Sequence, residues 1–132
     1  MPRPNEAAFV YSYDRRQRKP SLLAFSGALL AASAVALGAY ASHAAIEAQA
    51  QANLQTASVY AFGHGIALAA LAASTTRRLG RIGLYLLLLG TLLFSGSLAL
   101  AVLAQTGTRL APFGGFCLML GWIAWAVDAL RR

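Results

Sequence analysis

Two histidines are the side chains of this sequence best suited to chemistry, because imidazole changes its charge near neutral pH and binds metals. His43 and His64 fall at the edge of one long uncharged run and within another, and Tyr60 precedes His64 by one helical turn. One interpretation pairs the two histidines as axial ligands of a haem, or as part of a metal site, in a helical bundle. The other is structural, with His64 bonding Tyr60, Ser95 or Ser97 across helices. The sequence leaves both interpretations open.

Other reactive patterns are absent from the sequence. It contains no phosphate-binding loop, dinucleotide fingerprint, HExxH, CxxC or nucleophile elbow. A proton-coupled exporter needs a carboxylate within its membrane helices, whereas the apolar runs contain no acid until Asp128 at the end of the last one. Asp128 is close to Arg131 and Arg132, which favours an ion pair at the membrane surface. We therefore expect a protein that is not an enzyme and holds no cofactor, with the histidine site as the alternative.

The elements that must position these residues are apolar runs. Hydrophobic residues make up 58% of the chain and charged residues 11%, against about 25% charged in soluble proteins. The run from Ile82 to Ala104 has no ionisable side chain and is long enough to cross a bilayer. Residues 43–58, without Gly or Pro, should be helical outside the hydrocarbon, either extending a membrane helix or forming an interfacial turn. The expected organisation is a basic tail over 1–20 and a membrane domain over 21–132, with spans at about 21–42, 57–76, 82–104 and 110–128.

The positive residues predict the orientation of these spans. With four spans, all eleven Lys and Arg residues except Arg109 fall on one side, so both termini should be cytoplasmic. Trp122, Trp125 and Asp128 then lie toward the inner interface as anchors. The net charge of +7 does not indicate nucleic-acid binding, because the basic residues flank apolar runs instead of forming a water-facing patch. The predicted fold class is all-α, an integral membrane antiparallel four-helix bundle.

Small residues predict how the helices pack. They recur at seven-residue intervals, a period that gives close left-handed packing of neighbouring helices. The repeats are Gly27, Ala34 and Ala41, then Gly83, Gly90, Ser97 and Ala104, and finally Gly114, Gly121 and Asp128. Further glycines expected to pack against other helices are Gly38, Gly96 and Gly115.

Four ordered motifs resemble those of a known family. Residues 38–44, GAYASHA, resemble its GAFGAHA signature, and residues 59–71, VYAFGHGIALAAL, are similar to its RYQFYHALALL segment. Residues 93–98, LFSGSL, and 111–122, APFGGFCLMLGW, resemble its LFSGSLY and TPIGGxxxLxGW elements. The chain is thus identified as a member of DUF423, a family of small integral membrane proteins related to transmembrane protein 256. The resemblance implies four membrane helices and no established activity.

The resemblance also marks individual residues. The positions that match the family motifs are His43, Tyr60, His64, Ser95, Gly96, Ser97, Gly114, Gly115, Gly121 and Trp122. The chain departs from the family at Gly63 and Gly65, where the family has bulkier residues, and at Ala99, where it has Tyr. Less bulk around His64 could open a cleft or admit a partner helix.

Small-residue helix faces without a catalytic constellation predict a protein that acts through packing. We expect a non-enzymatic accessory, assembly or scaffold protein of the bacterial inner membrane, or of a mitochondrial membrane if the source is eukaryotic. Its partners would be the lipid bilayer and another membrane protein or a second copy of the chain. One alternative is a haem- or metal-binding protein using His43 and His64. Another is a carrier of small solutes or lipids, suggested by the uncharged core and by the glycines near His64.

Overall fold

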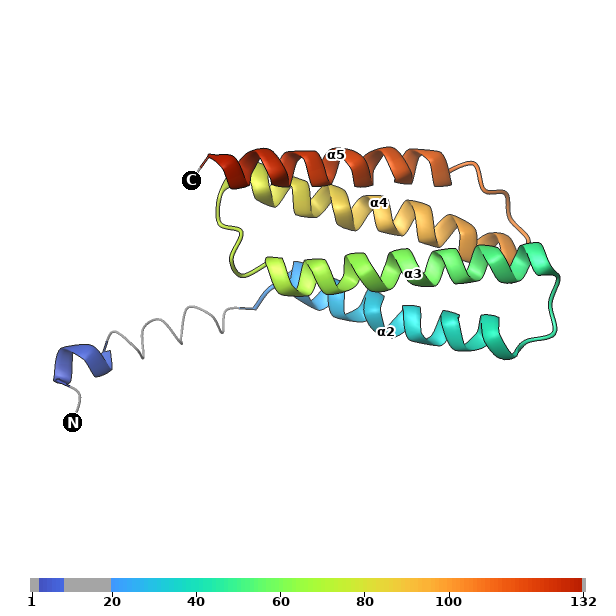
Figure 1. Cartoon of the computed structure of the whole chain (residues 1–132), viewed down its shortest axis with the longest axis horizontal. Helices are drawn as coiled ribbons and strands as arrows, with labels where there is room; N and C mark the ends of the chain where they lie inside the picture. The colour runs from blue at the N-terminus through green and yellow to red at the C-terminus, as the bar shows by residue number, and fades with distance from the viewer. Residues whose placement is uncertain (1–2, 9–19, 132) are drawn as a thin grey trace.

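The protein is all-helical in its computed structural model, which describes residues 3–8 and 20–131 (Figure 1). Each of the four main helices is long and apolar enough to cross a membrane, which confirms the prediction of four membrane-length helices. They are α2 (Leu22–His43), α3 (Ala48–Leu71), α4 (Arg78–Leu103) and α5 (Ala111–Leu130). The predicted basic tail is described only in part, because its cluster of positive residues at 15–19 lies outside the described residues.

The helix boundaries follow local signals. α2 begins after Pro20 with Ser21 as its N-cap, whose Oγ accepts a hydrogen bond from the N–H of Ala24 at 3.2 Å. α5 carries Pro112 in its first turn, where the missing N–H leaves no helical bond unmade. Beyond the end of α4, Gln105 takes a left-handed conformation with φ 53°, a common way for the chain to leave a helix.

The second expected span, 57–76, is the one that the structure changes most. α3 starts at Ala48 and ends at Leu71, so most of the stretch between His43 and Ser58 extends a membrane-length helix. Only residues 44–47 form the connection from α2. The high helix propensity of the Ala- and Gln-rich stretch explains this result, because nothing in it interrupts the helix.

α2 and α3 form the first hairpin and run in opposite directions (Figure 1). A Cβ built on Gly27 would lie 2.5 Å from the carbonyl oxygen of Gly65, so the two backbones touch there. Toward the α2–α3 connection, Ser58 Oγ donates to the carbonyl of Ala34 at 2.7 Å. Each α2 residue in these contacts, and Ala41 after them, is buried. The predicted seven-residue repeat of α2 is therefore confirmed as the face that meets α3.

α4 and α5 form the second hairpin, packed in the same way. A Cβ on Gly83 would lie 2.7 Å from the carbonyl oxygen of Gly121, and a Cβ on Gly90 would lie 2.8 Å from that of Gly114. The two contacts are seven residues apart along each helix, as the repeat predicts. Ala104 departs from the prediction, since it is exposed just beyond the end of α4.

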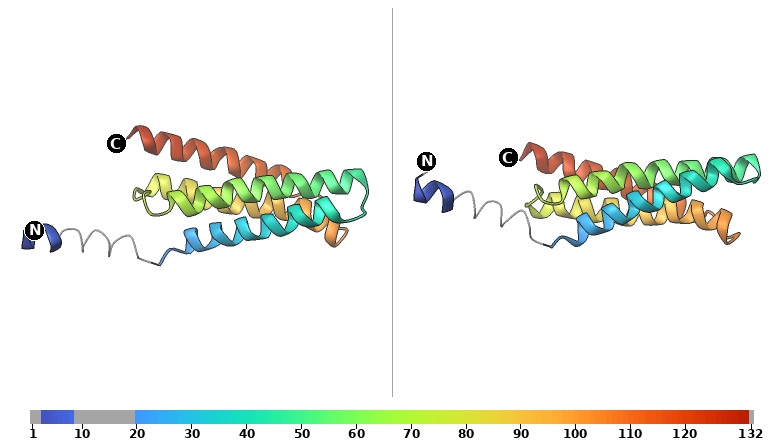
Figure 2. Two further views of the ribbon diagram at one scale, coloured as in Figure 1. Left: turned by 60° about the horizontal axis from the view of Figure 1, so that its bottom comes forward. Right: turned by 90° about the horizontal axis from the view of Figure 1, so that it is seen from below.

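The two hairpins meet less closely than their own helices do. α3 packs along α4 and α2 touches α4 briefly, whereas the described helices α3 and α5 share no close backbone contact. Figure 2 shows the four helices aligned along one long axis. The apolar core lies toward the end where α3 connects to α4, and it consists of Leu23, Leu68, Ala72, Leu84, Leu87 and Leu118.

Candidate functional site

His64 makes two hydrogen bonds, one within α3 and one that links α3 to α5. Its Nδ1 lies 2.8 Å from the carbonyl oxygen of Tyr60, and its Nε2 lies 3.1 Å from the indole Nε1 of Trp122. A carbonyl only accepts hydrogen bonds and an indole N–H only donates them. The network therefore assigns His64 as a neutral imidazole with its proton on Nδ1. The lone pair on Nε2, which a metal or a proton would need, is used by Trp122.

An aromatic cluster surrounds this histidine. It consists of Tyr60, His64, Phe94, Trp122 and Trp125. The Tyr60 and Phe94 ring centroids are 4.6 Å apart, and His64 lies 5.9 Å from both Tyr60 and Trp122. Trp125 continues the series in an edge-on contact with Trp122 at 6.5 Å. These separations are in the range where aromatic pairs attract one another. The cluster therefore joins α3, α4 and α5 by side chains where α3 and α5 have no backbone contact.

A second set of contacts ties α5 to the connection between α3 and α4. Trp125 Nε1 donates to the hydroxyl of Thr75 at 3.1 Å, and Thr75 is buried. Arg77 donates from its guanidinium to the backbone carbonyl of Arg131. The indole N–H groups of Trp122 and Trp125 are thus bonded within the protein. Their role as membrane-interface anchors stays a prediction.

Asp128 is buried, with 6% of its surface exposed. A Cβ built on Gly80 would lie 2.5 Å from its Oδ2 and 2.6 Å from the methyl group of Thr75. The carboxylate therefore lies against the first turn of α4, where unpaired N–H groups and the helix dipole favour a negative charge. Asp128 therefore helps to hold α5 against α4. The predicted ion pair with Arg131 and Arg132 stays a prediction, since residue 132 lies outside the described residues.

Of the three partners predicted for His64, Tyr60 is bonded to it through its backbone carbonyl, whereas the prediction of Ser95 or Ser97 is wrong. Both serines are buried, and neither hydroxyl has a hydrogen-bond partner. Phe94 is the α4 residue that packs on Tyr60, and the group that bonds Nε2 of His64 comes from Trp122 of α5.

The pairing of His43 with His64 around one haem or metal is also wrong. His43 is exposed at the end of α2, where Gln51 of α3 donates to the carbonyl of Ala41 at 2.9 Å. His64 lies thirteen residues beyond Gln51, which is about 20 Å along a helix. Metal–nitrogen bonds are about 2 Å long, so one ion cannot reach both rings. Among the described residues, no three His, Cys, Asp or Glu side chains could hold a metal ion together.

The predicted packing glycines divide into two groups. Gly27, Gly83, Gly90, Gly114 and Gly121 touch a neighbouring backbone, and Gly38 faces the side chain of Ser58. Gly96 and Gly115 make no such contact with the described residues, because a Cβ on either would meet nothing of residues 3–8 and 20–131 within 4 Å. Gly63 and Gly65 flank His64 and replace bulkier residues of the family. Gly65 lets α2 pack closely, because it contacts Gly27, whereas a Cβ on Gly63 would meet no atom within 4 Å.

Sequence reasoning missed two members of this region, Phe94 and Thr75. Phe94 stands in the LFSGSL motif immediately before Ser95, and an aromatic ring at this motif position is the sequence signal that marks it. Thr75 had no sequence signal, because a threonine in a connection is an ordinary residue until Trp125 bonds to it.

Four membrane-length helices joined by short connections make this chain a multi-pass membrane protein. It belongs to the family whose model matches residues 34–115 and is described as "Protein of unknown function (DUF423)". It is also 38% identical over 104 residues to the UPF0382 membrane protein of Haemophilus influenzae, an alignment that covers 74% of this chain and 84% of the relative. No solved structure matches the chain. The family resemblance inferred from the sequence motifs is confirmed.

Proposed function

We propose that this chain is a non-enzymatic accessory or scaffold protein that acts by packing against another membrane protein or a second copy of itself. The observation that carries the proposal is a set of helix glycines that touch no neighbouring helix in the part of the chain that the structure describes. Gly63, Gly96 and Gly115 lie within helices, and a Cβ on any of them would meet nothing within 4 Å. Glycine destabilises a helix by about 1 kcal/mol relative to alanine. A helix from outside the chain would offset this cost by packing closely there, as small residues allow in membranes.

The polar side chains support the same proposal. Both nitrogens of His64, the indole N–H groups of Trp122 and Trp125, and the hydroxyl of Ser58 are engaged in hydrogen bonds within the protein. Groups bonded in this way hold helices together and are not free to bind a substrate. The alternative of a small-solute or lipid carrier stays a prediction.

The proposed setting is a bacterial inner membrane, or a mitochondrial membrane for a eukaryotic source, spanned by an antiparallel four-helix bundle with both termini in the cytoplasm. The start of α2, the α3–α4 connection and the C-terminus lie at one end of the molecule (Figure 1). That end carries Arg77, Arg78, Arg81 and Arg131, all exposed. A cluster of arginines on one side favours the cytoplasmic face.

Reporter fusions test this orientation. An enzyme active only outside the cytoplasm should be active when fused after Gln51, and one active only in the cytoplasm should be active when fused after Arg132. The opposite pattern at both positions would reverse the proposed orientation.

Purification from native membranes in a lipid-preserving polymer tests the packing role. We expect a stoichiometric partner or a homo-oligomer. Gly96→Leu or Gly115→Leu should reduce recovery of that partner, while Ala126→Leu, at an exposed alanine of α5, should not. A strictly monomeric particle without a partner would contradict the proposal.

A further inference from the structure

The bond between His64 and Trp122 joins two helices whose backbones do not touch. It is the one hydrogen bond between side chains of α3 and α5 within residues 3–8 and 20–131. The described helices α3 and α5 make no close backbone contact. Trp125 bonds to Thr75 of the α3–α4 connection instead, and α5 packs along α4. Loss of the His64–Trp122 bond would therefore release α5 from α3 without releasing it from α4.

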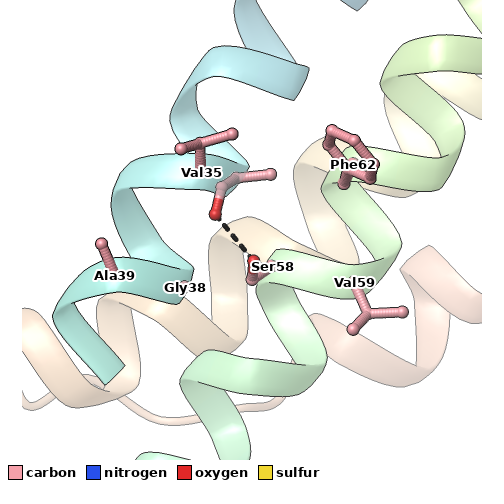
Figure 3. Close-up of a pocket in the computed structure, with 7 residues that line it drawn as sticks. Val35, Gly38, Ala39, Ser58, Val59 and Phe62 are labelled. Atoms are coloured by element: carbon pink, nitrogen blue, oxygen red, sulfur yellow. Dashed lines mark hydrogen bonds between the residues drawn. The ribbon is translucent and has the colours of Figure 1, made fainter. Parts of the chain in front are cut away.

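The first hairpin shows what this junction lacks. There too a side chain bonds across two helices, since Ser58 of α3 donates to the carbonyl of Ala34 at 2.7 Å (Figure 3). Close backbone contact supports that bond, because a Cβ on Gly27 would lie 2.5 Å from the carbonyl oxygen of Gly65. No such contact joins α3 to α5. At the junction the side-chain bond therefore controls how closely the two helices lie.

The bond forms only while His64 is neutral. The indole N–H of Trp122 can only donate, so Nε2 of His64 must supply a lone pair. The ring proton is on Nδ1, which donates to the carbonyl of Tyr60 at 2.8 Å. An added proton would bind Nε2, the nitrogen that holds the lone pair, and two N–H donors would then face each other at 3.1 Å. The bond would be lost.

No neighbouring charge would hold a protonated His64 in its place. The rings that contact it are those of Tyr60 and Trp122, and neither carries a charge. Asp128 is the one acid within helices α2 to α5, and it lies six residues beyond Trp122, about 9 Å along α5. A charged ring without an acceptor is costly in hydrocarbon, so it would move toward water. The other titratable side chains of these helices are Tyr40 and His43 of α2, Arg78, Arg81 and Tyr85 of α4, and Cys117 of α5.

We propose that protonation of His64 opens the seam between α3 and α5, so that the separation of the two hairpins depends on pH. The ring is half-buried and its partner Trp122 is 38% exposed, which leaves the site open to a proton. The bond is complete at higher pH, where the imidazole is neutral, and is lost as the pH falls. Each hairpin stays intact, because its glycine contacts involve no titratable group. This device does not depend on the proposed partner of the open glycines.

Nuclear magnetic resonance of the full chain in phospholipid nanodiscs follows the charge and the bond separately. In a His43→Gln variant the ring nitrogen shifts report on His64 alone, because the chain has two histidines. The indole N–H resonance of Trp122 reports its hydrogen bond. We expect this resonance to shift in step with protonation of His64 between about pH 8 and about pH 5, the range in which histidine changes charge. The resonance of Trp125, whose acceptor is Thr75, should not shift with it.

Distances between spin labels test the opening of the seam. The labels are attached to Ile66→Cys of α3 and Ile123→Cys of α5, both exposed positions, in a Cys117→Ser background. Lowering the pH over the same range should raise the population with the longer distance roughly tenfold, because one interhelical hydrogen bond is lost. A label pair at Leu89→Cys of α4 and Ile123→Cys is the matched control. Its distance should stay constant, since both labels lie on the second hairpin.

His64→Gln separates the charge from the structure, because an amide side chain stays neutral at every pH. This variant should lose the pH response of the Trp122 resonance and of the label distance, whereas His43→Gln should keep both. An equal pH response in His64→Gln and the wild type would overturn the proposal. So would a His64 that stays neutral down to about pH 5, or a protonated His64 that leaves the Trp122 resonance and the α3–α5 distance unchanged.

Discussion

Each hairpin is held by backbone contact, whereas the two hairpins are held to each other by side chains. Within the hairpins, Gly27 meets Gly65 and Gly90 meets Gly114 at distances that leave no room for a Cβ. Between the hairpins, His64 reaches Trp122 across a gap where α3 and α5 have no close backbone contact. Substitutions within a hairpin contact should therefore destabilise the fold more than substitutions at the side-chain junction between the two hairpins.

The physical reason is that lipid removes the hydrophobic force between helices. What remains is close packing, which needs small residues, and single hydrogen bonds between helices worth about 0.6 to 2 kcal/mol each. A glycine contact brings many atoms of two helices together at once. The His64–Trp122 junction depends on one hydrogen bond and a few ring contacts, so its loss should be far easier to tolerate.

The largest effect is expected at the second hairpin. Gly114→Ala places a Cβ 2.8 Å from the carbonyl oxygen of Gly90, and backbone can move aside only if the helices separate. We expect a loss of about 3 kcal/mol of stability, measured by unfolding in mixed detergent and dodecyl sulfate. Gly115→Ala, the same change one residue later, meets nothing within 4 Å and serves as the control. Equal stability of the two variants would show that the close contact is unimportant.

A similar contrast should appear in the first hairpin. Gly65→Ala would bring a Cβ 2.6 Å from the carbonyl oxygen of Gly27, while Gly63→Ala meets no atom within 4 Å. We expect the first change to cost about 2 kcal/mol and the second to stabilise α3 by up to about 1 kcal/mol. The same unfolding measurement applies. If Gly63→Ala instead weakens binding to a partner, that result would support an external contact at this glycine.

A smaller effect is expected at the junction. Trp122→Phe removes the indole donor to His64 and should cost about 1 kcal/mol. In a His64→Ala background the same change should cost less, because its acceptor is already gone. The four stability measurements of this double-mutant cycle give the coupling directly. Additive effects would mean that the two rings do not cooperate in holding α5 to α3.

The smallest effects should have opposite signs at different serines. Ser95→Ala and Ser97→Ala remove buried hydroxyls without a partner, so stability should stay the same or rise by up to about 1 kcal/mol. Ser58→Ala removes a bond to Ala34 and should lower stability by about 0.6 kcal/mol. A clear loss of stability at Ser95 would reveal a bonding partner for its hydroxyl.

Most of the helical framework could be predicted from the sequence, because its causes are local. Uncharged runs such as Ile82 to Ala104 must be helical in hydrocarbon, where every backbone group needs a partner. The repeat of Gly27, Ala34 and Ala41 likewise identified the α2 face that meets α3. The start of α3 at Ala48 could not be predicted in the same way, because the propensity of residues 48–56 allows either a continued helix or an interfacial turn.

The candidate site could be predicted only in part. Tyr60 and His64 belong to the predicted polar site and Trp122 matches a family motif, but Ser95 and Ser97 of α4 were the other predicted partners of His64, and its Nε2 is bonded by Trp122 of α5 instead. A motif shows that a residue belongs to a pattern, and it does not give the distance between side chains on separate helices. On α4 the residue that contacts the site is Phe94, because its ring packs against Tyr60.

The sequence by itself determined that this chain is a membrane protein of four helices and which glycine repeats could bring them together. Length, hydropathy and a seven-residue period are properties of one helix and need no knowledge of its neighbours. Only the tertiary structure decided which glycines touch a backbone and which, like Gly96 and Gly115, stay open. The tilt and register of one helix against another set these contacts, and a shift of one residue turns a side chain by about 100° and changes its partner.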